Sequence, residues 1–139
     1  MKIALKDNEK FVLRFDKGEE VIAGIASFMK EHGVYACFFS AIGSAAEVEL
    51  GYYNSFLKEY RHKPFVENLE VISLNGNGAT NGDQPVLHAH GLLGRTDFST
   101  FGGHVFRLVV LATCEVTLTV MQGRLERSKN EDFNLNLLA

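Results

Sequence analysis

The sequence has no tryptophan, only two prolines and only two cysteines among its 139 residues. It contains no run of about 18 apolar residues, which excludes an ordinary membrane-spanning helix. Two cysteines are too few for the disulfide framework of a small secreted protein. Cys37 and Cys114 also lie in apolar segments that suit buried, reduced thiols. Residues 1–7 become charged too early for a signal peptide. We therefore expect a cytoplasmic protein with no membrane partner.

Positive charge is also scarce, because 14 lysines and arginines are outnumbered by 17 acidic residues and the formal net charge is −3. This balance provides no global attraction to a phosphate backbone. The chain has neither an extended basic run nor aromatic residues interleaved with basic ones, a pattern typical of nucleic-acid-binding surfaces. We expect DNA binding to be weak or absent.

The glycine-rich segment at residues 76–83 superficially suggests a dinucleotide-binding loop. Its glycine spacing is wrong, and Pro85 and a predicted strand follow where the helix of such a motif would begin. We therefore reject nucleotide binding and interpret the segment as a plain loop.

The composition is that of a folded globular domain. The hydrophobic share is 46% and the charged share is 22%, both close to the average. A chain of this length forms one domain by the usual prior and can bury its own core. We expect a single domain over residues 1–139.

One helix is predicted after an N-terminal β-hairpin at residues 2–15. Asp16 is the expected cap, and Glu19 would complete a capping box. Gly33 can end the helix in the left-handed conformation. The residues between them show apolar side chains at helical spacing, typical of a face packed on the core: Val21, Ile22, Ile25, Phe28 and Met29.

The rest of the chain alternates between strand-like segments and turn-like residues. A break is expected at 43–46, and a solvated basic loop at 61–63. Many strands and one helix predict an α+β fold, with a mainly antiparallel β-sheet packed with one principal helix. The predicted strands are 35–42, 48–53, 56–60, 69–74, 86–93, 100–112, 116–120 and 133–137.

The segment from Leu87 to His104 contains three of the five histidines. His88 and His90 are two residues apart, so on a strand they share one face. After a turn-like cluster the chain returns through two glycines to His104, and in a hairpin this histidine would lie beside the other two. Three imidazoles with an open fourth position are typical of catalytic or ligand-binding zinc sites. The glycines would let the backbone pass close to a neighbour.

Other interpretations of these residues stay open. Two histidines at this spacing also occur by chance, and histidines on strands are often solvated. The apolar neighbours of His88 and His90 favour protein surroundings, where buried imidazoles need partners. Glu115 and Arg95 flank the segment and are candidates for a catalytic group, but they are more simply a strand-surface charge and a turn residue. No general base is identified.

Five segments occur in this order along the chain: FSAIGSAAEVELGYYN, LEVISLNGNGA, PVLHAH, GGH and CEVTL. Together they resemble the plant and prokaryote conserved (PPC) domain family, and the resemblance covers about residues 8–122. It implies an α+β fold, a homotrimer in the stand-alone prokaryotic members, and a metal bound by His88, His90 and His104. The plant members carry preceding AT-hooks, and no Arg-Gly-Arg-Pro-like segment occurs in this sequence. The domain is also similar in fold to acetolactate decarboxylase, whose metal is held by three histidines.

Two functions of different classes follow. The first is a homotrimeric, zinc-binding domain with a regulatory or ligand-binding role and at most a weak association with DNA. The alternative is a metal-dependent lyase or hydrolase acting on a small carbonyl-containing substrate, in which the cation polarises a carbonyl or activates water. The apolar segment from Phe38 to Tyr53 exceeds what one helix can cover, which favours subunit contacts there.

Overall fold

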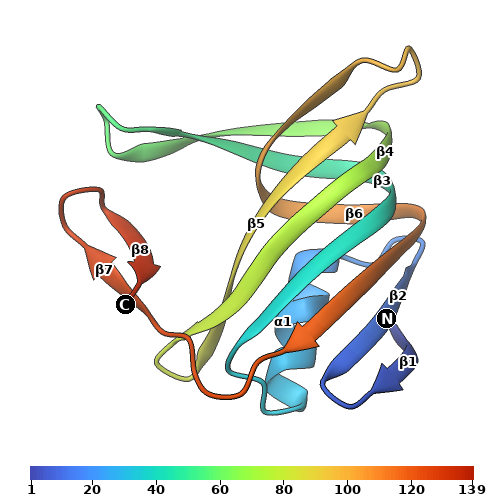
Figure 1. The fold of residues 1–139 in the computed structure, drawn as a ribbon. Helices are drawn as coiled ribbons and strands as arrows, with labels where there is room; N and C mark the ends of the chain where they lie inside the picture. The colour runs from blue at the N-terminus through green and yellow to red at the C-terminus, as the bar shows by residue number, and fades with distance from the viewer.

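A computed structural model describes all 139 residues, and Figure 1 shows a twisted antiparallel sheet with one helix on its inner face. The six strands of the sheet follow the order β1-β2-β6-β3-β4-β5. The predicted α+β fold is confirmed. The elements are β1 Lys2–Asp7, β2 Lys10–Asp16, α1 Val21–Glu31, β3 Cys37–Asn54, β4 Glu59–Asn81, β5 Gln84–Gly94, β6 Thr100–Val120, β7 Arg127–Asn130 and β8 Leu135–Leu138.

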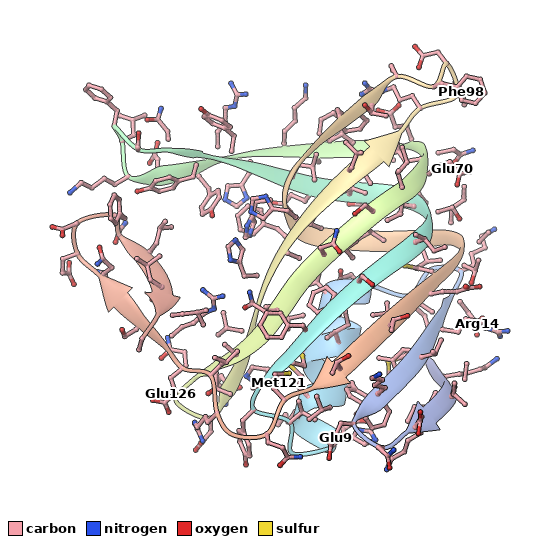
Figure 2. All side chains as sticks on the ribbon, viewed as in Figure 1. Glu9, Arg14, Glu70, Phe98, Met121 and Glu126 are labelled. Atoms are coloured by element: carbon pink, nitrogen blue, oxygen red, sulfur yellow. The ribbon has the colours of Figure 1, made fainter.

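Strand β6 closes part of the sheet into a ring. Strand β3 pairs with β6 along almost its whole length, from His104 to Val120, while β2 pairs with residues 113–119 of β6 and β5 pairs with residues 100–104. Strands β3, β4, β5 and β6 therefore form a continuous circuit of hydrogen-bonded neighbours. The loop between β5 and β6 projects beyond this circuit, and Phe98 at its tip is exposed (Figure 2).

The helix α1 covers the inner face of the sheet with the predicted apolar stripe. Its cap is Glu20 and not Asp16, because the Glu20 carboxylate accepts hydrogen bonds from the backbone N–H groups of Ile22 and Ala23. Glu19 accepts a bond from the backbone N–H of Asp16, so the predicted pair is in contact, but one turn before the helix begins. No helix of the protein is long and apolar enough to span a membrane.

The core lies between α1 and the sheet. Phe15 and Phe28 are its largest fully buried side chains, and they come from β2 and α1. Cys37 and Cys114 are both buried and unpaired, as the sequence predicted. Burial raises the pKa of each thiol to about 11, so both are neutral and belong to the core.

Three predicted interruptions of strands were wrong, and the predicted short strand at 56–60 is mostly the turn between β3 and β4. Strand β6 runs through residues 113–115, which were expected to separate two strands. Strand β3 runs through residues 43–46 with two register shifts in place of a break. Strand β4 includes residues 61–63 and continues to Asn81, so the expected basic loop and most of the expected glycine loop are strand. The turn between β4 and β5 is only Gly82-Asp83, where Gly82 has a φ of +58°.

The C-terminal residues form a separate two-stranded hairpin, β7 and β8. The hairpin lies near the long ribbon formed by the outer ends of β3 and β4 (Figure 1). The Tyr53 hydroxyl donates a hydrogen bond to the Phe133 carbonyl at 2.5 Å, and the Asn134 amide donates to the Lys58 carbonyl at 3.4 Å. These contacts hold the hairpin beside the sheet.

Candidate metal centre

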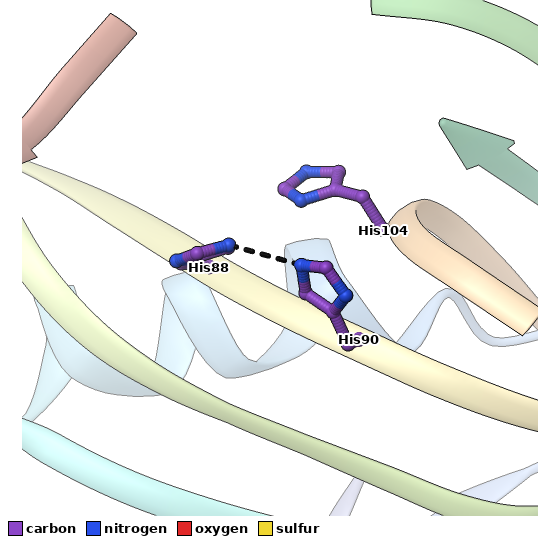
Figure 3. Close-up of side chains that lie close together, drawn as sticks. All are labelled: His88, His90 and His104. Carbon is purple, nitrogen blue, oxygen red and sulfur yellow. Dashed lines mark hydrogen bonds between the residues drawn. The ribbon is translucent and has the colours of Figure 1, made fainter. Parts of the chain in front are cut away.

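Three histidine side chains converge on the outer face of the sheet (Figure 3). His88 and His90 both point away from the core, because Ala89 between them on β5 is buried. His104 on β6 lies directly opposite His90 in the register of the two strands. The predicted hairpin forms, and its pairing brings the three imidazoles together.

The distances between the imidazole nitrogens suit a shared ligand. The Nε2 atoms of His88 and His90 are 3.2 Å apart, and one nitrogen from each of the three histidines lies within 4.8 Å of the others. Zinc–nitrogen bonds of about 2.0–2.1 Å in a tetrahedral site place the bound nitrogens roughly 3.4 Å apart. One pair is already at that separation, and small ring rotations would bring in the third.

His88 and His104 are held in the form that binds metals. Burial lowers the pKa of His104 from 6.5 to about 4, with smaller contributions from nearby imidazoles and Arg127. The pKa of His88 is also lowered, first by burial and then by Arg127 and His90. Neutral imidazole is the metal-binding form. The Nδ1 atom of His104 is buried without a hydrogen-bond partner, so a cation there would satisfy an orphaned polar atom.

Aromatic side chains position His104. Its ring centroid lies 4.9 Å from that of Tyr60 and 4.4 Å from that of Phe106. His62 stacks on the other side of this group, 4.2 Å from Phe106, and its Nδ1 is 2.7 Å from the Glu49 carboxylate. His88 is half-buried while His90 is exposed, so the predicted protein surroundings hold for His88 and were wrong for His90. His104 is also half-buried.

Two hollows meet at the histidines. The first, of about 570 Å³, lies on the outer face of the sheet, where Asn75 and Asn77 adjoin His90 and His88 in the strand register. The second, of about 430 Å³, lies between His88, His104 and the C-terminal hairpin. No carboxylate lines either hollow.

The two flanking residues noted in the sequence are not part of this site. Arg95 forms a two-pronged ion pair with Glu67 at 3.1 Å and lies 4.0 Å over the Phe101 ring. Glu115 is exposed on β6 opposite Ile42 and lines neither of the two hollows that hold the histidines. The simple interpretations, a turn residue and a strand-surface charge, describe them.

Sequence reasoning missed Tyr60 and Arg127, which line the second hollow. Tyr60 was predicted to end a short strand, and Arg127 stood in a polar stretch with no periodic signal. Each reaches the histidines through a long-range feature of the fold: the β3–β4 ribbon for Tyr60, and the C-terminal hairpin for Arg127. The only signal in the sequence was the position of Arg127 shortly before the apolar alternation at residues 133–137.

Comparison with known families gives one match to most of the chain. Residues 4–122 match the sequence profile of the Plants and Prokaryotes Conserved (PCC) domain, also abbreviated PPC. No curated protein matches the sequence.

Several solved structures share the fold over nearly the full length. A metal-containing protein of Archaeoglobus fulgidus is 35% identical, with a TM-score of 0.87 over 100% of this chain and 99% of that one. A PPC protein of Pyrococcus horikoshii is 28% identical, with a TM-score of 0.88 over 100% and 97%. A protein of Bacteroides thetaiotaomicron, suggested to bind DNA, is 28% identical, with a TM-score of 0.93 over 97% and 94%.

A more distant likeness concerns the fold alone. Acetolactate decarboxylase of Bacillus subtilis is 16% identical, with a TM-score of 0.56 over 91% of this chain and 58% of the enzyme. The expected similarity of fold is confirmed, and it carries no reaction to this chain.

Proposed function

This chain belongs to the Plants and Prokaryotes Conserved domain family, and we propose that it is a homotrimeric zinc-binding protein that binds a small ligand at a three-histidine site. The observation that carries the proposal is the convergence of His88, His90 and His104, with one nitrogen from each within 4.8 Å of the others. A related protein of Archaeoglobus fulgidus is metal-containing, which supports the same assignment.

Each histidine would hold the ion through one imidazole nitrogen. Three neutral nitrogen ligands suit zinc and leave a fourth coordination position for a ligand. The cation supplies Lewis acidity at that position, and the protein supplies the walls. The aromatic contacts of Tyr60 and Phe106 fix the ring of His104, so they position a ligand of the ion without binding it.

A binding role is favoured over catalysis by the lining of the two hollows. General acid–base chemistry needs a titratable group within hydrogen-bond reach of the substrate. Neither hollow is lined by an aspartate or a glutamate, and Glu49 is already engaged with His62. Tyr60 and Lys129 line the second hollow, but burial raises the pKa of Tyr60 further above neutrality, and Lys129 pairs with Glu131. The residues that remain are suited to hold a ligand and to exclude water.

The trimer is supported by the apolar part of the outer sheet face. Phe38, Ile42, Ile72 and Leu92 are 41–60% exposed there, on neighbouring strands. Exposed apolar side chains gathered on one face are typical of subunit contacts. Because Phe38 lines the same hollow as His88 and His90, a neighbouring subunit on this face would lie beside the metal site. We place this single domain, residues 1–139, in the cytoplasm, in keeping with its two free thiols.

The test of the proposed function is zinc binding by the purified protein. The protein should bind one zinc ion per chain, and His90→Ala should weaken zinc binding by more than about a hundredfold, because even outer partners of metal ligands contribute ten- to a hundredfold. His32→Ala is the matched control, since His32 stacks on Phe28 at the end of α1 and lines neither hollow. Equal zinc affinity in His90→Ala and the unaltered protein would refute the assignment.

A further inference from the structure

Arg127 is a buried cation with no carboxylate partner. Its side chain is only 8% exposed, and none of the nine ion pairs of the protein includes it. The guanidinium donates hydrogen bonds to the Asn136 carbonyl at 3.0 Å and to the Asn77 side-chain oxygen at 2.7 Å, and its Nε–H has no partner. Two neutral acceptors leave the positive charge uncompensated.

An uncompensated charge in this position is costly, because burial of an ion is unfavourable unless an opposite charge accompanies it. By contrast, Arg95 and Arg107 form ion pairs with glutamates at the surface. The charge of Arg127 also acts on the histidines, since it contributes to the lowered pKa values of His88 and His104. Arg127 also lines the same hollow as His88 and His104, so one ligand in that hollow could contact both the arginine and the metal centre.

The hollow between them has the size and chemistry of a site for a small organic anion. Its volume is about 430 Å³, within the range of ligand pockets. His88, His104 and Arg127 line it together with Lys129, while three leucines supply apolar walls: Leu87, Leu135 and Leu137. The C-terminal hairpin that contributes Arg127 is held in place by Tyr53 and by Asn77. The histidines, Arg127 and the apolar wall therefore all belong to elements of defined position.

We propose that this hollow binds a small aliphatic carboxylate, with the carboxylate group between Arg127 and the cation held by the three histidines, and the hydrocarbon body against the leucines. A carboxylate matches both a zinc ion and the planar guanidinium, which binds carboxylates through charge-assisted hydrogen bonds. The inference rests on the proposed metal site. It adds a residue outside the matched family region, since residues 4–122 do not include Arg127.

A purely structural role of Arg127 is the competing explanation, since the side chain joins the C-terminal hairpin to β4 through Asn77. The two explanations differ in what they require of a ligand. A purely structural arginine requires no bound anion, whereas a carboxylate site should distinguish an acid from its neutral amide of the same shape.

The test uses isobutyrate and isobutyramide as probes, titrated calorimetrically into the full-length, zinc-loaded protein. Isobutyrate should bind, and isobutyramide should bind at least about tenfold more weakly. Arg127→Met should weaken isobutyrate binding by about ten- to a hundredfold, the usual worth of a hydrogen bond to a charged group. Arg61→Met is the matched control, because it removes an exposed guanidinium of β4 outside the hollow, and its affinity should stay within about threefold.

The outcomes separate this inference from the proposed function. Zinc bound at one ion per chain with equal binding of acid and amide, or with unchanged isobutyrate affinity in Arg127→Met, overturns the carboxylate site alone. Absence of zinc by metal analysis overturns the proposed function, and the carboxylate site with it. If Arg127→Met does not fold, Arg127→Lys keeps the charge but loses the fork and should bind isobutyrate about tenfold more weakly. The acid–amide comparison in the unaltered protein is decisive in either case.

Discussion

His104 combines a half-buried ring, an orphaned Nδ1 and a pKa of about 4. The main cause of the low pKa is burial, and the charges of His88, His90, His62 and Arg127 act in the same direction. Protonation of His104 would place a further positive charge in a cluster that has no carboxylate lining. The burial that disfavours a proton also disfavours an isolated cation, so metal binding at His104 depends on sharing the ion with the nitrogens of His88 and His90.

The stability of the protein after chelation of metals should therefore depend on pH through His104. Its folded pKa is lowered from 6.5, so between about pH 4 and 6.5 the unfolded state binds more protons than the folded state. The contribution of the neutral ring is fully present above pH 6.5 and is lost as the pH falls toward 4. The full shift corresponds to about 3 kcal/mol, which partial exposure reduces to roughly 1–2 kcal/mol.

Urea unfolding at pH 7.5 and 4.5 measures this dependence. The free energy of unfolding of His104→Asn should fall by about 1–2 kcal/mol less than that of the unaltered protein over this interval. All other ionisable groups are the same in both proteins, so the difference between the two pH dependences isolates His104. Parallel decreases would show that this residue is not held neutral by the fold.

At the scale of elements, local periodicity predicted much of the fold. The apolar stripe from Val21 to Met29 identified α1, and the alternation around His88 and His104 identified the hairpin that assembles the site. Both signals depend only on residues close in sequence. The choice of cap was wrong because Glu20 has a second partner far along the chain, the backbone N–H of Leu108 at 2.9 Å.

The glycines explain the wrong strand boundaries. A Cβ on Gly76 would lie 2.5 Å from both the His88 carbonyl oxygen and the Phe39 ring, and one on Gly78 would lie 2.4 Å from the sulfur of Met29. These glycines remove side chains where a neighbouring strand or the helix approaches, so they extend β4 where the sequence suggested a loop. The same reasoning was right for Gly102, whose Cβ would lie 2.2 Å from the Gly91 carbonyl oxygen.

The candidate site was predictable only in part, because some of its residues are brought together by contacts between distant parts of the chain. The three histidines lie on one hairpin, so spacing and register suffice to bring them together. Tyr60 and Arg127 reach His104 and His88 through segments whose positions are set by tertiary contacts, such as the bond between Tyr53 and Phe133. No local pattern encodes a contact between residues that are dozens of positions apart.

At the scale of the whole molecule, the net charge of −3 argues against strong binding of DNA. Some relatives are suggested to bind DNA. We expect this chain to bind duplex DNA weakly, without preference for sequence, through counterion release alone. A titration of A/T-rich and G/C-rich duplexes at rising salt should show equal affinities that decline together. A sub-micromolar complex with A/T-rich duplex that tolerates salt would contradict this prediction.

The last prediction concerns assembly. Cyclic closure of a trimer requires two different complementary patches on each subunit. The outer sheet face is our choice for one of them, because Ile42 is 60% exposed and Phe38 is 49% exposed on the same face as the histidines. Light scattering or sedimentation at micromolar concentration should therefore report three chains.

A lysine at the centre of this patch should separate the subunits. Ile42 is largely exposed in the single chain, so Ile42→Lys should leave the fold intact, whereas in a trimer it would bury an unpaired charge. Leu5→Lys on β1 is the matched control, since Leu5 is 59% exposed and lines neither histidine hollow. The Leu5→Lys protein should remain trimeric. An unaltered protein that is monomeric would remove both the trimer and the shared site. A trimer that persists in Ile42→Lys would move the contact to another face.

If the patch is correct, removal of zinc should also lower the trimer fraction near the dissociation constant, because a ligand bound at a subunit boundary stabilises the assembly by mass action.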